Sequence, residues 1–151
     1  MPDVAPFPEN MQRDEIRRVQ SDRLRHLLDE IIPANAFWTE KFSAAGVELS
    51  SVSDVDDLAK LPLTIKSELV EDQDSHPPYG RNLTYDVVAY SRLHQTSGTT
   101  GSPIRWLDTP ASWDWFMDCW SQIFRMVGLT AEDRLAFPFS FGPFVGFWAA
   151  F

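Results

Sequence analysis

The stretch from Gln95 to Pro103 holds the residues of this chain that are best suited to chemistry. Hydroxyl side chains and two glycines fill every position from Thr96 to Ser102. Glycine lets the backbone turn sharply and lacks the Cβ that would keep an anion away. Successive amide N–H groups can then converge on phosphate oxygens, and hydroxyls add further donors. This composition predicts a cradle for nucleotide phosphates, formed by Thr96, Ser97, Gly98, Thr99, Thr100 and Gly101.

An ordinary turn is the alternative interpretation of the same residues, because Gly, Ser and Thr also dominate turns between strands. The flanking segments 87–90 and 104–107 are rich in strand formers, as the arms of a hairpin would be. A hairpin turn needs only about two to five residues, and this loop is longer and richer in hydroxyls. No Gly-Lys-Ser/Thr follows, so it is not a Walker loop.

The composition limits the classes of protein to which the chain can belong. It has 151 residues, 44% of them hydrophobic, which suffices for one modest domain with a core. A net charge of −9 argues against nucleic acid and against anionic membrane surfaces as partners. An acidic protein that binds a triphosphate needs local donors, and the uncharged amides and hydroxyls of the loop would supply them.

Metal, disulfide and targeting signals are weak in this sequence. The single cysteine, Cys119, excludes an internal disulfide and a thiolate cluster. The histidines His26, His76 and His94 lie far apart and lack metal-ligand spacing. The sequence has neither a secretory signal pattern nor an apolar run long enough to cross a membrane. We therefore expect a cytoplasmic protein without a metal site of its own.

Hydrophobic periodicity and breakers predict short helices in the first half of the chain and an α/β arrangement in the second. The expected helices cover 10–32 (stopped by Pro33), 37–46, 53–61 (capped by Ser53) and 64–71 (capped by Thr64). The expected strands cover 87–90, 104–107 and 134–139. A long helix over 113–127, opened by Thr109 or Ser112 and ended by Gly128, has an aromatic stripe that we expect to be core.

Residues 137–151 form an apolar segment without any charged residue. An apolar surface of this kind is a liability in a free monomer. We expect either that the chain is part of a larger protein, whose remainder covers this edge, or that the edge is covered by self-association.

Three segments resemble the adenylate-forming (AMP-binding) ligases, specifically their phenylacetate–CoA ligase-like branch. Residues 96–103 are similar to the phosphate-binding motif of that superfamily. Residues 57–69, with Leu61-Pro62-Leu63-Thr64-Ile65-Lys66, resemble a signature upstream of the nucleotide domain, and residues 37–46 resemble a helix of the branch. The segments follow the order of the family from about Leu24 onward.

The resemblance implies an ATP-dependent carboxylate–CoA ligase. Ser97, Thr99 and Thr100 would bind the ATP phosphates, and Gly98 and Gly101 would permit their close approach. Mg²⁺ and coenzyme A are implied with ATP, and a carboxylic acid would be the substrate. The thiol of a carrier protein could replace that of coenzyme A. Phe139 and Phe141 fall where relatives place aromatic residues near the acyl pocket, which suits an aromatic or apolar acid, although simple core packing explains them equally well.

The sequence also departs from the family pattern. The family loop often has Lys where Ser102 stands, and the nearest cation here is Arg105. The acidic residue for magnesium, the aspartate for ribose and the catalytic lysine of the family would all lie beyond Phe151. No catalytic residue is therefore assigned within this chain, and we expect the 151 residues alone to be inactive in adenylation.

The predicted organisation is a disordered arm over 1–9, a helical region over 10–82, and the incomplete start of an AMP-binding α/β domain over 83–151. Two other functions stay open. One is a non-catalytic binding or assembly module, in which the hydroxyl loop is a structural turn. The other is a ligase-like enzyme that activates an amino acid for a carrier protein.

Overall fold

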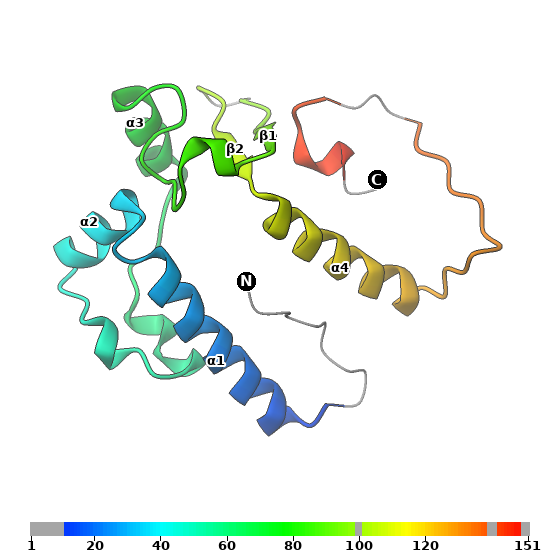
Figure 1. Ribbon diagram of the computed structural model, residues 1–151, viewed down its shortest axis with the longest axis horizontal. Helices are drawn as coiled ribbons and strands as arrows, with labels where there is room; N and C mark the ends of the chain where they lie inside the picture. The colour runs from blue at the N-terminus through cyan, green and yellow to red at the C-terminus, as the bar shows by residue number, and fades with distance from the viewer. Residues whose placement is uncertain (1–10, 99–100, 139–141, 149–151) are drawn as a thin grey trace. The chain divides into compact units, whose positions relative to one another are not determined.

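The computed structural model in Figure 1 describes residues 11–98, 101–138 and 142–148. The predicted arm over 1–9 lies outside the described residues. The chain divides into two compact units, one within Phe7–Val87 and one within Val88–Phe151. This division falls a few residues after the sequence-based boundary at 82 and 83. The described helices include none with the length and apolar character needed to cross a membrane.

The first unit is helical, as its hydrophobic periodicity predicts. Helix α1 has an apolar stripe and two acidic residues, Asp14 and Glu15, in its first turn, where they favour the positive end of the helix dipole. It ends one residue before the extended Ile32, because Pro33 disfavours a helical conformation in the residue that precedes it. The elements of this unit are α1 (Arg13–Ile31), α2 (Ala36–Ala44), the 3-10 turns η1 (Leu49–Ser51) and η2 (Val55–Lys60), and α3 (Lys66–Ser75).

The core of the first unit joins α1 to α2 and to the turn after η1. Leu28, Phe42 and Val52 are each about 5% exposed or less and form one cluster. Partly buried apolar side chains surround them, among them Leu24, Trp38 and Leu61. Helix α2 closes with Gly46 at φ +65°, a left-handed conformation that glycine adopts without penalty.

Two predicted caps in this unit are wrong. Asp54, not Ser53, caps the third helical segment, and this segment is the 3-10 turn η2, not an α-helix. The Ser53 hydroxyl instead donates to the carboxylate of Asp57 (3.0 Å). Helix α3 begins after Ile65, whose N–H donates to Glu68 Oε2 (2.7 Å). The hydroxyl oxygen of Thr64 is buried and has no hydrogen-bond partner in the described part of the chain.

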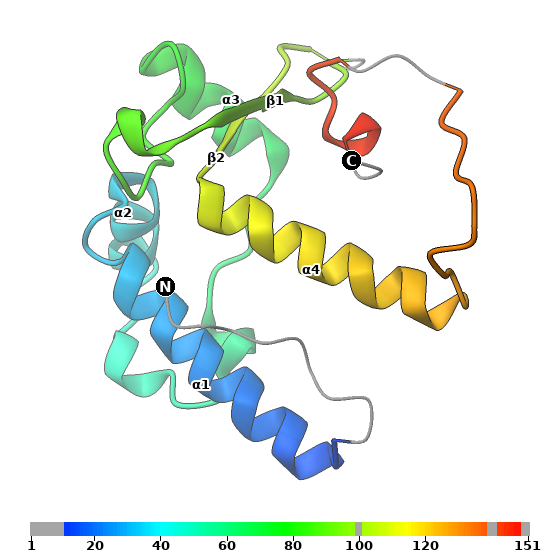
Figure 2. The ribbon, with the colours of Figure 1, turned by 45° about the vertical axis from the view of Figure 1, so that its right-hand side comes forward.

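The second unit begins with a β-hairpin that leads into a long helix (Figure 2). Strand β1 (Arg92–Gln95) pairs antiparallel with β2 (Arg105–Asp108), with Gln95 opposite Arg105. The prediction for β2 is confirmed within one residue. The strand predicted over 87–90 is wrong, because η3 (Val87–Ala89) is a 3-10 turn and the pairing with β2 selects the next segment.

Helix α4 (Pro110–Met126) confirms the long helix expected after the second strand. The Thr109 hydroxyl accepts from the N–H of Ser112 (3.1 Å), so Thr109 is the cap of the two candidates. Gly128 has φ +76° just beyond the helix, as a terminating glycine should.

The predicted third strand is wrong, and the predicted core stripe on α4 is confirmed only in part. Residues 134–138 belong to no helix or strand, and no described segment pairs with them; Phe139 lies outside the described residues. Of the stripe on α4, Trp113 is buried and Phe116, Trp120 and Phe124 are partly buried, while the aliphatic Ile123 and Val127 are exposed. In the described residues, the helix-rich architecture with a two-stranded sheet agrees with the α/β start expected from the sequence.

Candidate functional site

The hairpin presents the hydroxyl-rich loop at the ends of β1 and β2. The N–H of Thr96 donates to the carbonyl of Ile104 (3.0 Å), which extends the ladder by one pair. The N–H of Ile104 donates in return to Thr96 Oγ1 (2.9 Å). Thr96 therefore closes the base of the loop with its backbone and its side chain, while the proton of its hydroxyl can still be donated. Ile104 is buried and anchors this closure.

The two glycines of the loop adopt conformations that other residues avoid. Gly98 has φ +65° and Gly101 has φ +146°. The N–H of Gly101 donates to the carbonyl of Gly98 (3.1 Å), which folds the loop back on itself. A Cβ on Gly98 would lie 3.0 Å from Pro103 Cγ and 3.1 Å from the carbonyl oxygen of Gly101, whereas a Cβ on Gly101 would meet nothing within 4 Å. The backbone thus needs glycine at both positions, and at Gly98 for space as well.

The remaining predicted site residues divide between described and undescribed positions. Thr96 and Ser97 are exposed at the start of the loop. Thr99 and Thr100 lie outside the described residues, as do Phe139 and Phe141. The grouping of the loop hydroxyls and the assignment of an acyl pocket therefore remain predictions.

Arg105 is the cation nearest the loop in sequence, and the pairing of the strands decides its direction. Consecutive strand residues point to opposite faces of a sheet. Ile104 is buried, so Arg105 lies on the face opposite to Ile104 and alongside Gln95, its partner across the ladder. The N–H of Gln95 points away from β2 and donates to the carbonyl of Pro143 (2.6 Å), so the 142–148 segment lies against the outer edge of β1.

Sequence reasoning missed a cluster around the buried His94, which lies in β1 just before the loop. His94 is only 4% exposed, and its ring stacks on that of Trp113 with centroids 5.4 Å apart and planes 18° apart. The guanidinium carbon of Arg92 lies 4.3 Å from the Trp113 ring centroid, in cation–π geometry. The sequence could have indicated this cluster through the two-residue spacing of Arg92 and His94, which places both side chains on one face of β1.

Asp108 joins this cluster to the beginning of α4. Its carboxylate accepts from the Ser112 hydroxyl (3.1 Å) and lies 3.5 Å from Nε2 of His94. Burial lowers the pKa of His94 below its ordinary value; nearby Asp108 opposes this shift and Arg92 adds to it. His94 is therefore neutral near pH 7.

The acidic run Asp54, Asp56 and Asp57 has structural partners. Asp54 caps η2, Asp56 pairs with Arg17 of α1, and Asp57 lies 2.7 Å from Lys60 Nζ. Hydrogen bonds from Lys60 and Ser53 hold the pKa of Asp57 well below its usual range. In the described residues no three His, Cys, Asp or Glu side chains gather as metal ligands.

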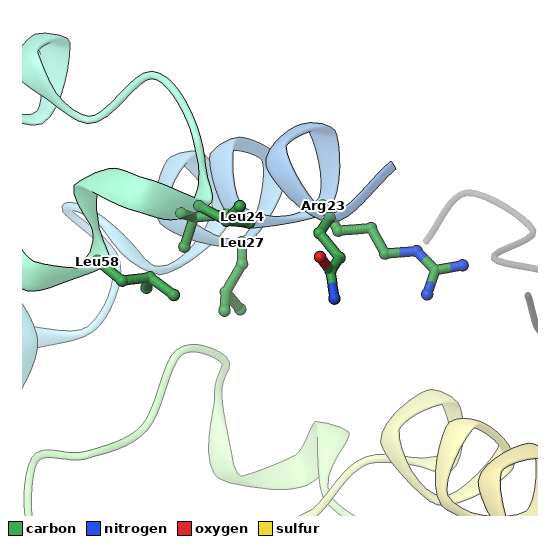
Figure 3. A pocket seen from close by; sticks show the side chains of 6 residues that line it. Arg23, Leu24, Leu27 and Leu58 are labelled. Atoms are coloured by element: carbon green, nitrogen blue, oxygen red, sulfur yellow. The ribbon is translucent and has the colours of Figure 1, made fainter. Parts of the chain in front are cut away.

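The first unit has an open groove between α1 and η2, with a volume of about 420 Å³ (Figure 3). Leu24, Leu27 and Leu58 gather at it, and the charged end of Arg23 points away from them. Its lining is mostly apolar, with Gln20 and Arg23 as the polar residues, and contains no run of hydroxyls and glycines like that of the loop. The groove therefore does not replace the loop as a phosphate site.

No family model matches the chain. It is 28% identical over 138 residues to phenylacetate-coenzyme A ligase of Escherichia coli (strain K12), a match that covers 91% of this chain and 30% of that protein. It is 29% identical over 144 residues to phenylacetate-coenzyme A ligase of Aromatoleum evansii, which covers 95% of this chain and 31% of that protein.

A solved structure gives the same result at the level of the fold. The crystal structure of 2-hydroxyisobutyryl-CoA ligase, in complex with 2-HIB-AMP and CoA, superposes with a TM-score of 0.86 at 26% identity. This match covers 94% of the present chain and 30% of the ligase chain. The chain thus spans roughly a third of the length of these relatives. By sequence and fold, the chain is similar to the N-terminal portion of the phenylacetate–CoA ligase-like branch of adenylate-forming ligases.

Proposed function

We propose that the chain is the N-terminal portion of an ATP-dependent carboxylate–CoA ligase and that residues 96–101 bind the phosphates of ATP. The observation that carries the proposal is the loop held between β1 and β2, in which Gly98 and Gly101 have positive φ angles and Thr96 and Ser97 are exposed. Such a backbone leaves an anion room to approach amides and hydroxyls. The similarity to CoA ligases supports the same assignment.

The proposed reaction has two steps. A carboxylate oxygen of the substrate attacks the α-phosphorus of ATP, the bond from that phosphorus to the bridging oxygen breaks, and pyrophosphate leaves. The sulfur of a thiolate then attacks the acyl carbon, and AMP leaves as the thioester forms. AMP is a far better leaving group than oxide, which is why the acid must be activated first. The loop would hold the phosphates in place and neutralise charge that develops on pyrophosphate.

Magnesium, when bound, would neutralise charge on the phosphates. It commonly keeps several waters and binds substrate phosphates with one or two carboxylates. Among the described residues, no three His, Cys, Asp or Glu side chains gather as ligands for it. The acid, which we expect to be aromatic or apolar, the choice between coenzyme A and a carrier-protein thiol, the inactivity of the 151 residues alone and the cytoplasmic location all belong to this proposal.

The test is ATP–pyrophosphate exchange by the polypeptide that the gene encodes, measured across aryl, arylacetic, fatty and amino acids. We expect exchange with an aromatic or apolar acid and a loss of at least about tenfold in kcat/KM on Gly98→Val, because the new side chain would enter Pro103 and distort the loop. Gly46→Val is the matched control, because Gly46 has the same φ of +65° but nothing within 4 Å.

Absence of exchange with every acid would contradict the proposal, and so would equal effects of the two glycine variants. Exchange with amino acids alone would favour the carrier-protein alternative. A binding or assembly module is the second candidate, and the exposure of Ile123, Met126 and Val127 on and after α4 favours it. Self-association in light scattering that ignores ATP and AMP would support that module.

A further inference from the structure

We propose that His94 is a positioning residue for the phosphate loop: its neutral ring, packed between β1 and α4, holds the hairpin in the conformation that binds phosphate, and its protonation releases that conformation. The inference rests on the proposed function, because it assigns a role to a residue of β1 that lies just before the same loop.

The position of His94 couples α4 to the loop. It lies in β1 two residues before Thr96, whose N–H and Oγ1 close the loop through Ile104. Its ring stacks on Trp113, which is itself buried in the first turns of α4. A shift of the His94 ring would move β1 against α4, and the closure at Thr96 would move with it.

The chemistry of the site makes the ring sensitive to protonation. Both ring nitrogens are buried, and neither has a hydrogen-bond partner within the described chain. A buried polar atom without a partner costs free energy, and a buried charge costs more. An apolar ring at this position would avoid this cost. The presence of a histidine therefore indicates that gaining or losing a proton has a role here.

The groups around His94 determine whether its pKa is raised or lowered in the folded hairpin. Asp108 of β2 attracts the protonated ring, Arg92 of β1 repels it, and α4 offers the uncharged Trp113. Burial outweighs the attraction, so the pKa of His94 lies below its ordinary value. The folded hairpin therefore binds the proton less well than the unfolded chain does. The contribution of neutral His94 to the stability of the hairpin is therefore complete above about pH 6.5, the ordinary histidine pKa. It is lost as the pH falls through the pKa of His94 in the folded chain.

The kinetic test uses the polypeptide that the gene encodes and measures KM for ATP and kcat in pyrophosphate exchange. His94→Ala is expected to raise KM for ATP about tenfold at pH near 7.5, with a smaller change in kcat, because the loop binds ATP less well. Leu93→Ala is the matched control, since Leu93 is the neighbouring strand residue on the opposite face and is 44% exposed.

The pH test uses His94→Phe, which keeps an aromatic ring on Trp113 but cannot be protonated. The ratio of KM for ATP at about pH 5.5 to that at about pH 7.5 is expected to be several-fold larger in the wild type than in this variant. The terminal phosphate of ATP titrates in the same range and affects both proteins equally. The difference between the KM ratios of the wild type and of His94→Phe therefore tests the role of His94. Equal ratios would overturn it, and so would equal effects of His94→Ala and Leu93→Ala.

A second readout requires no ATP. Amide hydrogen exchange of Thr96 and Ile104 reports the closure of the loop directly. We expect their protection factors to fall on acidification in the wild type and to stay unchanged in His94→Phe; unchanged protection in both would overturn the inference. A wild type that shows this fall but no pyrophosphate exchange would contradict the proposed function and leave the positioning of the loop by His94 supported.

Discussion

The conformation of the loop requires particular residues at several positions, whatever the loop binds. Gly98 and Gly101 have positive φ angles, and a side chain at Gly98 would also press against Pro103. Thr96 uses its hydroxyl oxygen to accept from Ile104, so its first task is structural. The phosphate-binding role that we propose therefore depends on a loop whose shape is already specified by its own hydrogen bonds.

Gly98→Ala is expected to destabilise the fold more than Gly46→Ala. Both residues have φ +65°, so a non-glycine residue costs about 1 kcal/mol at either position. At Gly98 the added Cβ also lies 3.0 Å from Pro103 Cγ, which we expect to add about 1 kcal/mol. Urea denaturation followed by circular dichroism measures both losses. Equal losses would mean that the loop relaxes around the new methyl group.

Caps and short polar networks position the helices of the first unit. Asn35 is 3% exposed and accepts from the N–H of Trp38 at the start of α2 (3.3 Å). Its amide nitrogen donates to Asn82 Oδ1 (3.1 Å) and Thr84 Oγ1 (3.2 Å), which ties a distant segment to that helix. One side chain thus satisfies a helix end and joins segments far apart in sequence.

Asn35→Ala is expected to lower the free energy of unfolding by about 2 kcal/mol, because a cap is lost and two partly buried acceptors lose a donor. Asn82→Ala, which removes one of these hydrogen bonds and spares the cap, is the matched comparison and should cost less. Urea denaturation measures both. A larger loss for Asn82→Ala would show that the cap contributes little.

Glu68 is expected to make the stability of the first unit depend on pH. Hydrogen bonds from Lys41 and from the N–H of Ile65 lower its pKa in the folded state. The unfolded chain therefore binds the proton more readily, and the stabilisation present above the ordinary glutamate pKa is lost as the pH falls through the folded value. Thermal unfolding between about pH 6 and pH 3 should show a smaller loss for Glu68→Gln than for the wild type.

Glu71→Gln serves as the control for Glu68→Gln, since Glu71 lies on the same helix and is exposed. At neutral pH Glu68→Gln should have the lower melting temperature of the two, because it leaves the largely buried amine of Lys41 without its carboxylate. Identical melting curves for the two variants would show that the Lys41–Glu68 pair does not contribute to stability.

At the scale of the whole molecule, the chain consists of two units and leaves large apolar side chains exposed. Leu63 is 90% exposed in the first unit, and Met126 is 86% exposed at the end of α4. The chain spans roughly a third of the length of its ligase relatives. The expectation from the sequence concerned the apolar segment 137–151; we predict that further polypeptide or self-association covers these exposed side chains as well.

Limited proteolysis tests the division between the units. Hydrogen bonds from Asn35 hold Asn82 and Thr84 to the helical unit, whereas Val88 is 86% exposed in the turn that follows. Thermolysin cleaves before large apolar residues and should therefore cut first near Val87 and Val88. A first cut within α1 or α4 would contradict this division. A first cut at residue 83 would favour the boundary expected from the sequence.

The sequence by itself determined the features that depend on neighbouring residues. The helix ends at Pro33 and Gly128, the long helix after the second strand, the glycine-dependent loop and the resemblance to CoA ligases all follow from local patterns, because backbone geometry and short motifs act over a few residues. The prediction of β2 succeeded for the same reason.

Only the tertiary structure decided which segments pair and which side chains become buried. Residues 92–95, and not 87–90, form the first strand because they are the residues that pair with β2. Residues 134–138 form no strand because no described segment lies beside them to pair. His94 becomes a buried neighbour of Trp113 only when β1 packs on α4. Such contacts join residues distant in sequence, so periodicity and composition carry no direct signal for them.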